Sequence, residues 1–549
     1  MSKMTTINEK GKLKVIKDDG KKVVVGNSII PIVQQTNIDT NVISIFLEFL
    51  VDNKKKVIGI TRDKLHKAGI RNLTKYGADS WDNVADIYVD DIKNNLSSAK
   101  KTYEHSTVGL GIYEDNRIFK LYKGINIDSV YDESKYNIKP MGDYMVWEKM
   151  IQKEVLGNQY LEFALVAGFI APVINIISEE NNVESIIINF CGNSSTGKTL
   201  ATKLALSPWG LPDTSSNGLL KSWYATDQGI LSYLTGNFGV PIALDDTSLQ
   251  ENDKDYTQLI YQIVNGQTKT ALHIDGTNRR VGEWKTAVLS SSEDSIIKST
   301  DQNKKGILVR IFELKVKQIT TSAENAEKIA KVISKNYGHA GVMFAKYLME
   351  QDSASLDTRL EEIRADILSS IDKDSLSDRI ARKLAVMQLT GELVREALDI
   401  DIDLQKLKET LIEMEEKSIE DRNLSDKAYD SIIEYFQTNM GKFFKDGDTP
   451  KDYKESVGKY MVDTSGQITE IRIPKNIFEK IMKRLGYNQE SIINEWQRDG
   501  YLNCDKGKTT LTRVFHPRGG KINMYAIKIK KVTNVISISK SSEKVEEII

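Results

Sequence analysis

One segment limits most strongly how this chain can fold: a largely apolar run that leads directly into a glycine-containing loop. Residues Val183–Cys191 form the run, and Gly192-Asn-Ser-Ser-Thr-Gly-Lys-Thr199 follows it. Such a run is typical of a strand buried on both faces of a parallel sheet. The loop fits the pattern G-x4-G-K-[ST] at every defined position, and a helix is expected over Thr199–Leu206. The order of strand, loop and helix therefore predicts an α/β sheet that binds phosphate groups.

The chemistry of phosphate binding explains each defined position of this loop. Glycine lets the backbone pass close to phosphate oxygens, so that successive N–H groups point at them, and the helix adds its positive N-terminal end. We expect Lys198 to reach the β- and γ-phosphates of ATP and the hydroxyl of Thr199 to ligate Mg²⁺. The residues expected to contact the nucleotide are Gly192, Asn193, Ser194, Ser195, Thr196, Gly197, Lys198 and Thr199.

A second part of this site is expected where another apolar segment, Val240–Leu244, runs into Asp245 and Asp246. Asp245 is the expected magnesium partner of Thr199. Asp246 is expected to orient or activate the attacking water, at a position that is usually Glu. Aspartate is also common where a strand turns into a loop, but the phosphate loop upstream favours the catalytic interpretation of both residues.

Further catalytic candidates follow in chain order. Ser291, beyond the predicted strand that starts at Trp284, is a candidate for placing the water, and a plain serine turn explains it equally well. Arg310 is predicted to lie within an apolar strand, either as a salt-bridged arginine or as an arginine finger. A finger reaches the γ-phosphate of a neighbouring subunit and is worth about 10³–10⁵ in rate. Arg379 and Arg382, where a helix opens, are candidates for a second phosphate-sensing arginine.

Length and periodicity divide the chain into parts. At 549 residues it is too long for one ordinary core. Helical spacing of apolar residues dominates 339–440, and two helices followed by a hairpin around Gly519-Gly520 resemble a winged-helix domain. The predicted fold is multidomain α/β, with an N-terminal α+β domain (1–140), the P-loop core (141–338), a helical lid region (339–445), a winged-helix-like domain (446–535) and a tail (536–549). In the N-terminal domain strands are expected at Val23–Val25, Val57–Ile60, Thr107–Tyr113 and Arg117–Tyr122.

Charge, cysteine content and hydropathy narrow the class of protein. The net charge of −1 gives no global basic field, so any nucleic-acid surface must be local. The two cysteines, Cys191 and Cys504, form no disulfide or zinc pattern, which fits a cytoplasmic location. The apolar run Phe163–Ile177 is shorter than the roughly 18–20 residues that a membrane span needs. We expect it to be a buried helix beside the sheet.

The ordered motifs resemble an AAA+ ATPase module. More specifically, several short runs are similar to the MCM-like, self-loading replicative helicases of staphylococcal cassette chromosome elements, within a wider ATPase family of phages and integrated elements. The resemblance covers roughly 145–400 well and the C-terminal region more loosely. The matching runs are Cys191-Gly-Asn-Ser-Ser-Thr-Gly-Lys-Thr199, Ser222-Trp-Tyr-Ala-Thr226, Ala243-Leu-Asp-Asp246, Val264-Asn-Gly-Gln267, Leu289-Ser-Ser-Ser-Glu293, Asn336-Tyr-Gly-His339 and Asp378-Arg-Ile-Ala-Arg-Lys-Leu384.

This resemblance implies ATP-driven DNA unwinding by a ring, expected to be a hexamer with ATP sites between subunits. The implied partners are single-stranded or forked DNA, further copies of the chain and other replication proteins. The family usually has Asp-Glu where this chain has Asp245-Asp246. This difference leaves the rate of ATP hydrolysis open, whereas nucleotide binding is expected regardless of it. An ATP-switched DNA-binding initiator or loader without unwinding activity is the alternative.

Two basic hairpins are candidate DNA contacts. Asp275-Gly276 between strand-capable runs is a strong hairpin signal, and in MCM-like rings such a hairpin projects into the central channel, where cations can follow a phosphate backbone. A solvated basic turn explains it equally well. Near the C-terminus a basic hairpin can contact DNA phosphates as a wing, or belong to a protein-docking domain. The candidate residues are Lys269, His273, Arg279 and Arg280 in the first hairpin, and Lys506, Lys508, Arg513, Arg518 and Lys521 in the second.

Overall fold

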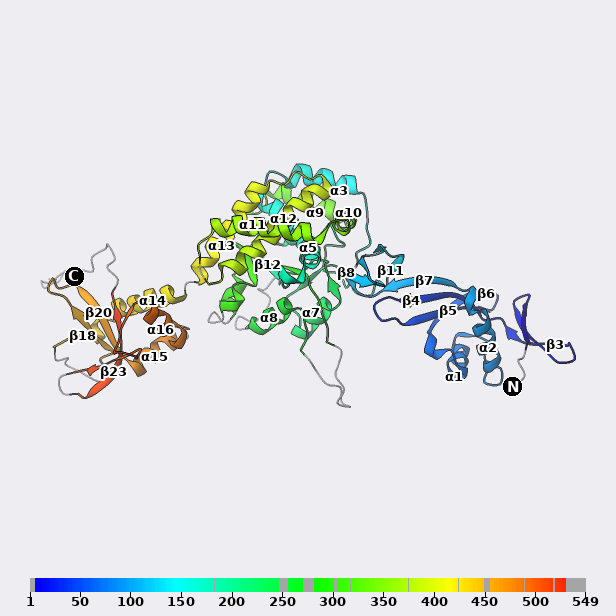
Figure 1. Ribbon diagram of the computed structural model, residues 1–549, viewed down its shortest axis with the longest axis horizontal. Helices are drawn as coiled ribbons and strands as arrows, with labels where there is room; N and C mark the ends of the chain where they lie inside the picture. Colours follow the sequence, from blue (N-terminus) through cyan, green and yellow to red (C-terminus); the bar gives the residue numbers. More distant parts are fainter. Residues whose placement is uncertain are drawn as a thin grey trace, which may run out of the picture. The chain divides into compact units, whose positions relative to one another are not determined.

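The computed structural model divides the chain into two compact units, each of which is described by itself. One consists of Met1–Thr300 with Gly306–Glu416, and the other of Asp301–Lys305 with Lys417–Ile549 (Figure 1). The structure describes residues 5–181, 183–245, 255–269, 281–300, 305–315, 317–373, 375–422, 424–448, 455–487, 489–516 and 519–529.

A five-stranded parallel sheet lies at the centre of the first unit. Its strand order is β13 (Leu220–Ser222), β15 (Ile242–Asp245), β16 (Ala287–Ser292), β12 (Ile186–Cys191) and β17 (Ile311–Lys315). Every residue of β12 and β16 is buried, as the apolar run predicted. Because β16 stands between β12 and β15, the loops that follow these three strands meet at one edge of the sheet.

Two corrections concern where these strands begin. Arg310 does not lie within a strand: its amide donates to the carbonyl of Ile307 at 2.8 Å, which closes a turn before β17 starts. The strand β16 also begins later than the predicted segment that started at Trp284. It also continues to Ser292, so Ser291 lies inside β16, near the carboxyl end of the strand, rather than in a turn beyond it.

The apolar run near residue 170 forms two buried helices, α4 (Gln159–Ala167) and α5 (Ile170–Ile176), which are bent by 49°. At the bend, the indole of Trp209 donates to the carbonyl of Gly168 at 2.7 Å. Among the described residues no single helix is long and apolar enough to cross a membrane, although this bent pair passes the same test by length and composition. The expected buried helix is therefore confirmed as a helix pair.

Helices cover the sheet and continue the chain beyond it. The phosphate loop leads into α6 (Lys198–Leu206), which contacts α4, α9 and strands β12, β15 and β16. The predicted helical region is confirmed, and α12 packs along α11 and also contacts α4, α5 and α10. Between the N-terminal region and the second unit, the helices not yet given bounds are α3 (Tyr144–Met150), α7 (Asp227–Leu234), α8 (Thr257–Asn265), α9 (Ala323–Ile333), α10 (His339–Met349), α11 (Ser353–Ser370), α12 (Ser377–Leu398) and α13 (Leu404–Arg422).

The N-terminal region is α+β, and its four predicted strands are present. It contains a three-stranded sheet, a five-stranded sheet with α2 (Ala85–Asn95) packed on it, and a four-stranded sheet that ends in β14. Because β14 (Asn237–Phe238) comes from the middle of the chain and pairs with β8, strand pairing joins this region to the core. The strands are β1 (Thr5–Glu9), β2 (Lys12–Ile16), β3 (Lys22–Asn27), β4 (Ile30–Asn37), β5 (Ile43–Val51), β6 (Lys54–Thr61), β7 (Lys100–His105), β8 (Val108–Tyr113), β9 (Asn116–Lys120), β10 (Gly124–Ile125) and β11 (Ser129–Tyr131).

The second unit combines helices with a mixed sheet, in which β18 pairs with β19 in parallel and the other pairs are antiparallel. Its predicted helices α15 and α16 are present, and β22 pairs with β23 as the predicted hairpin. The unit starts before residue 446, because Ile432 and Phe436 of α14 are buried in one apolar cluster with Phe478 and Trp496. Its elements are α14 (Leu424–Thr438), β18 (Phe443–Lys445), β19 (Gly458–Val462), β20 (Ile468–Pro474), α15 (Lys475–Arg484), α16 (Gln489–Arg498), β21 (Leu502–Asn503), β22 (Leu511–Val514) and β23 (Lys521–Lys528).

A buried ion pair stabilises the N-terminal sheets. The side chains of Asp39 and Lys120 are 11% and 8% exposed and lie 2.6 Å apart. Asp39 also accepts hydrogen bonds from the amides of Ser106 and Thr107. Burial raises the pKa of Asp39, but the ammonium of Lys120 and these amides outweigh burial and hold it below its usual value. The pKa of Asp39 in the unfolded chain is about 4. Because its pKa is lower in the folded state, the ionised carboxylate stabilises the folded protein above about pH 4. This stabilisation is lost as the pH falls through the lowered pKa.

We therefore predict that Asp39→Ala lowers the free energy of unfolding at pH 7 by about 3–5 kcal/mol, because it leaves Lys120 buried without its partner. Urea unfolding at pH 7 and at acid pH measures this, and the gap between wild type and variant should narrow below about pH 4. Asp86→Ala, which removes an exposed partner of Lys67, is the matched control and should cost at most about 1 kcal/mol. Equal losses in the two variants would contradict the prediction.

Candidate nucleotide-binding site

The loop between β12 and α6 has the backbone geometry that its glycines predict. Gly197, the residue before α6, has φ +94°, and a Cβ atom there would lie 2.9 Å from Cγ2 of Thr320. Both features favour glycine, since a side chain at positive φ is strained and this one would also clash. Ser195 also adopts a positive φ, +64°. The chain thus turns sharply enough to direct the first amides of α6 into the loop.

The side chain of Lys198 folds over this loop. Its Nζ atom donates to the carbonyls of Gly192 at 2.8 Å and Asn193 at 2.7 Å. The hydroxyl of Thr196 donates to the same Asn193 carbonyl at 2.9 Å, which closes a turn within the loop. An ionised phosphate oxygen is a stronger acceptor for an ammonium group than a neutral carbonyl. The geometry therefore suits an exchange of these carbonyls for phosphate oxygens.

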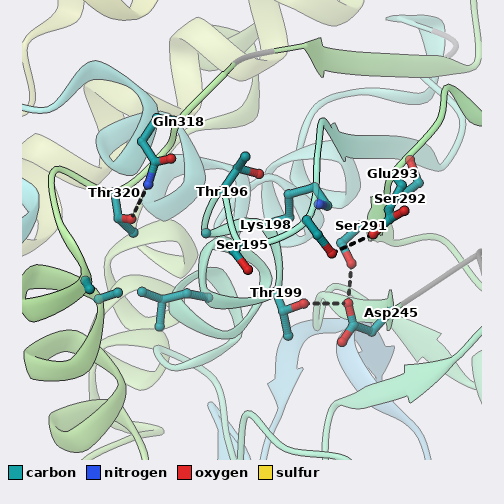
Figure 2. A pocket seen from close by; sticks show the side chains of 15 residues that line it. Ser195, Thr196, Lys198, Thr199, Asp245, Ser291, Ser292, Glu293, Gln318 and Thr320 are labelled. Carbon is teal, nitrogen blue, oxygen red and sulfur yellow. Dashed lines mark hydrogen bonds between the residues drawn. The ribbon is translucent and has the colours of Figure 1, made fainter.

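One carboxylate joins three segments that lie far apart in the sequence. Asp245, at the end of β15, accepts a hydrogen bond from the Thr199 hydroxyl at 3.0 Å, and its same Oδ1 atom accepts one from the Ser291 hydroxyl of β16. Figure 2 shows the three side chains meeting beside the loop. Carboxylate and hydroxyl oxygens are the hard donors that Mg²⁺ prefers in proteins. The donor set at Thr199 and Asp245 therefore fits the predicted magnesium site.

The loop opens onto a cavity of about 590 Å³. Its lining is mostly polar side chains of the loop, of the ends of β15 and β16, and of the segment that leads into α9 (Figure 2). The lining residues are Ser194, Ser195, Thr196, Gly197, Lys198, Thr199, Leu200, Asp245, Ser291, Ser292, Glu293, Gln318, Thr320, Ala323 and Ala326. A cavity of this volume is within the range of small-molecule sites in proteins.

Several of these lining residues were not predicted. Glu293 accepts a hydrogen bond from the Ser194 hydroxyl at 2.6 Å, and Gln318 donates to Thr320 at 3.1 Å across from the loop. Glu293 belongs to a run that carries the family resemblance, but nothing in the sequence placed its side chain beside the loop. Gln318 and Thr320 reach the site because the chain returns there after β17. No local sequence pattern indicates such a return.

Some predicted residues fall outside the described part of the chain, so their predictions stand as made. These are Asp246 beside the magnesium site, His273, Arg279 and Arg280 of the first hairpin, and Arg518 of the second. Of the remaining candidates, Lys269, Lys506, Lys508 and Arg513 are exposed. Arg513 lies on β22 and pairs with Asp505 at 3.0 Å.

The predicted arginines lie at the edge of the sheet opposite the phosphate loop of their own chain. Arg310 precedes β17, and its carbonyl accepts a hydrogen bond from the amide of Ile187 at the start of β12. The phosphate loop follows the other end of β12, about 17 Å away at roughly 3.3 Å per residue. Arg382 is also at this opposite edge, where its guanidinium donates to the carbonyl and side chain of Asn181 at 3.3 Å. Arg379, one turn earlier on α12, is exposed.

The guanidinium of Arg310 is largely buried, with its side chain 12% exposed. It donates to the carbonyl of Gly306 at 2.7 Å, lies 3.5 Å from the carboxylate of Glu184 and is centred 4.8 Å over the ring of Tyr261. Its Nε atom is buried and has no hydrogen-bond partner among the described residues. The salt-bridged alternative from the sequence analysis is thus present, and it leaves part of the guanidinium unsatisfied.

Comparisons with known proteins cover almost the whole chain. A family model described as a domain of unknown function (DUF927) matches residues 5–283, and one described as the Cch helix turn helix domain matches residues 423–532. A solved structure described as SCCmec type IV Cch, active helicase, is similar with a TM-score of 0.77 and 25% sequence identity, over 95% of this chain and 97% of that chain. No curated protein matches.

The shared carboxylate leads to a prediction about metal-dependent binding. Asp245→Asn keeps the shape of the side chain but removes the charge that a magnesium ion requires. In the wild type, ATP with Mg²⁺ should raise Tm further than ATP alone, since a ligand at about 100-fold its Kd stabilises by about 2.7 kcal/mol. The variant should lose this magnesium-dependent increment. Asp372→Asn, an exposed position, is the control, and an unchanged increment in Asp245→Asn would contradict the prediction.

Proposed function

The chain belongs to the DUF927 family of domains of unknown function, and we propose that it is an ATP-dependent DNA helicase. The observation that carries this proposal is the pairing of a phosphate loop with Asp245 and Ser291 at one edge of the parallel sheet. Similarity to a structure described as an active helicase over 95% of the chain supports it. The matched Cch helix turn helix domain supports DNA as the partner.

The site residues divide the chemistry of hydrolysis among them. Lys198 and the loop amides bind the β- and γ-phosphates, and their positive charge offsets the charge that develops on the γ-phosphoryl oxygens. Thr199 and Asp245 hold Mg²⁺, which supplies further positive charge there. Ser291, fixed by its bond to Asp245, orients the attacking water. Asp246 activates that water, with a shorter side chain than the glutamate usual at its position.

The core works as an AAA+ module in a ring, with each ATP site shared between two subunits. The strand order supports this, because β16 stands between the phosphate-loop strand and β15 and brings Ser291 to the magnesium site. The position of Arg310, Arg379 and Arg382 at the opposite edge supports shared sites. The backbone of Arg310 is about 17 Å from its own loop, by the length of β12, but a neighbouring copy can receive these arginines. The expected ring is a hexamer.

DNA is held by the two basic hairpins. Lys269 is exposed where the first predicted hairpin begins. In an MCM-like ring this hairpin would project into the central channel, where Lys269, His273, Arg279 and Arg280 would follow the phosphate backbone. In the C-terminal domain, which is winged-helix-like, the wing carries Lys506, Lys508, Arg513 and Arg518 to DNA phosphates. Contacts to the backbone give affinity without sequence preference. This suits a motor that moves along DNA of any sequence.

The biological setting follows from the same resemblances. The chain acts in the cytoplasm, in replication of a mobile genetic element, together with other replication proteins. The proposed division of the chain is an N-terminal α+β domain, the ATPase core, the helical lid and the C-terminal DNA-binding domain. An ATP-switched initiator or loader is the alternative, and it differs in binding DNA without opening it.

A forked duplex distinguishes these two functions. We predict that the wild type displaces one strand in the presence of ATP and Mg²⁺, and that single-stranded DNA stimulates hydrolysis. Lys198→Ala should abolish both, since it removes the ammonium that reaches the phosphates. Lys203→Ala, a lysine of the same helix α6 that does not line the cavity, is the control. If DNA binding depends on ATP but the fork stays closed, the alternative function replaces this one.

A further inference from the structure

Behind Arg310 lies a buried lysine to which the proposed reaction assigns no role. Lys383 of α12 has a side chain that is 5% exposed, and its Nζ atom donates to the carbonyl of Val309 at 3.1 Å. Val309 is the residue immediately before Arg310. A buried ammonium group is costly unless it is paired, so a lysine kept at this position calls for a reason beyond packing.

The same lysine shares the carboxylate that Arg310 uses. Nζ of Lys383 lies 3.7 Å from Oε2 of Glu184, whereas the guanidinium of Arg310 lies 3.5 Å from Oε1. Oε2 of Glu184 and Nε of Arg310 are buried and have no hydrogen-bond partner among the described residues. One carboxylate therefore faces two cations, and neither pair makes a short, well-formed bond. The cluster holds more positive charge than Glu184 can neutralise.

The electrostatics of Lys383 agree with this imbalance. Burial lowers the pKa of Lys383 to about 8; the carboxylate of Glu184 opposes that shift, and the charges of Arg310 and Arg379 add to it. Arg379 is thus close enough for its charge to act on Lys383, so both Arg310 and Arg379 add positive charge around the lysine. An excess of positive charge in a partly buried site favours an incoming anion.

We propose that Lys383 and Glu184 are positioning residues for Arg310, which hold its turn so that the guanidinium completes the ATP site of a neighbouring copy. The inference rests on the proposed function, since it needs sites shared between subunits. Lys383 fixes the backbone at Val309, and Glu184 restrains the guanidinium from the other side. When the γ-phosphate of the neighbour arrives, it supplies the negative charge that the cluster lacks. Lys383 then keeps Glu184 neutralised while Arg310 turns to the phosphate.

This arrangement also connects the helical region to hydrolysis. Lys383 and Arg382 are adjacent on α12, and Arg382 binds Asn181 just before β12. A movement of α12 relative to the sheet would therefore reach the Val309–Arg310 turn through Lys383. The lysine couples the position of α12 in one subunit to the rate of hydrolysis in the next.

The first test uses Lys383→Met, which keeps the length and apolar stem of the side chain and removes the charge. It should bind ATP with the affinity of the wild type, because the phosphate loop is intact. Its turnover at saturating ATP should fall by about 10²-fold, the cost of a misplaced catalytic group. Lys383→Arg should restore part of the loss. Lys408→Met removes an ion pair with Asp366 elsewhere in the helical region and should leave turnover unchanged.

Mixed rings show whether the effect crosses the subunit boundary. Lys383→Met and Lys198→Ala are each nearly inactive alone, but a 1:1 mixture should recover up to about a quarter of wild-type turnover. In a randomly mixed ring about one interface in four pairs an intact loop with an intact Arg310 turn. Glu184→Gln, which removes the shared charge and keeps the shape, should give the same two results.

The outcomes separate this inference from the function on which it rests. In one outcome, Arg310→Ala mixed with Lys198→Ala recovers activity, whereas Lys383→Met mixed with Lys198→Ala does not. Lys383 then acts within its own subunit, which overturns the inference but leaves the shared ATP sites of the ring supported. If neither mixture recovers, shared sites are wrong and the inference falls with them. Wild-type turnover in Lys383→Met and Glu184→Gln, or loss of ATP binding in both, would also overturn it.

Discussion

The shared carboxylate of Asp245 is the contact on which the candidate site depends. It accepts hydrogen bonds from Thr199, which follows β12, and from Ser291, which is on β16. The parallel register makes this possible, because Phe190 pairs with Ser291 and Leu244 with Ser290, so the three strands end at one level. The phosphate loop gains its acidic and hydroxyl partners from the order of strands, and not from nearness in sequence.

The same sheet also determines what lies far from the nucleotide. Since the strands are parallel, residues that precede them gather at the opposite edge, and Arg310 and α12 meet there. In the proposed mechanism, the phosphate loop of one copy receives the arginines of the next. Copies arranged head to tail bring these two edges together, and such an arrangement can close into a ring. The account of hydrolysis and the role given to Lys383 both follow from this polarity.

The sequence predicted the parts of the site where the chemistry requires particular residue types. It did not predict the contacts that form because distant segments of the chain come together in the fold. The loop 192–199, its flanking strand and helix, and Asp245 were predicted because phosphate binding restricts residue type at each position. Gln318 and Thr320 were missed, since only tertiary structure brings them to the cavity. Arg310 was expected within a strand because apolar neighbours flank it, but a backbone turn at Ile307 delays the strand. The pairing of β8 with β14 could not be predicted either, because it joins residues that lie far apart in the sequence.

The claim that each ATP site is shared between two subunits is tested most directly by comparing binding and turnover in Arg310→Ala. The account predicts that this variant binds ATP with wild-type affinity, because its own loop is untouched. It predicts that turnover falls by about 10³-fold or more, since the neighbouring site loses its arginine. Turnover close to that of the wild type, or a loss of ATP binding in step with turnover, would contradict the account.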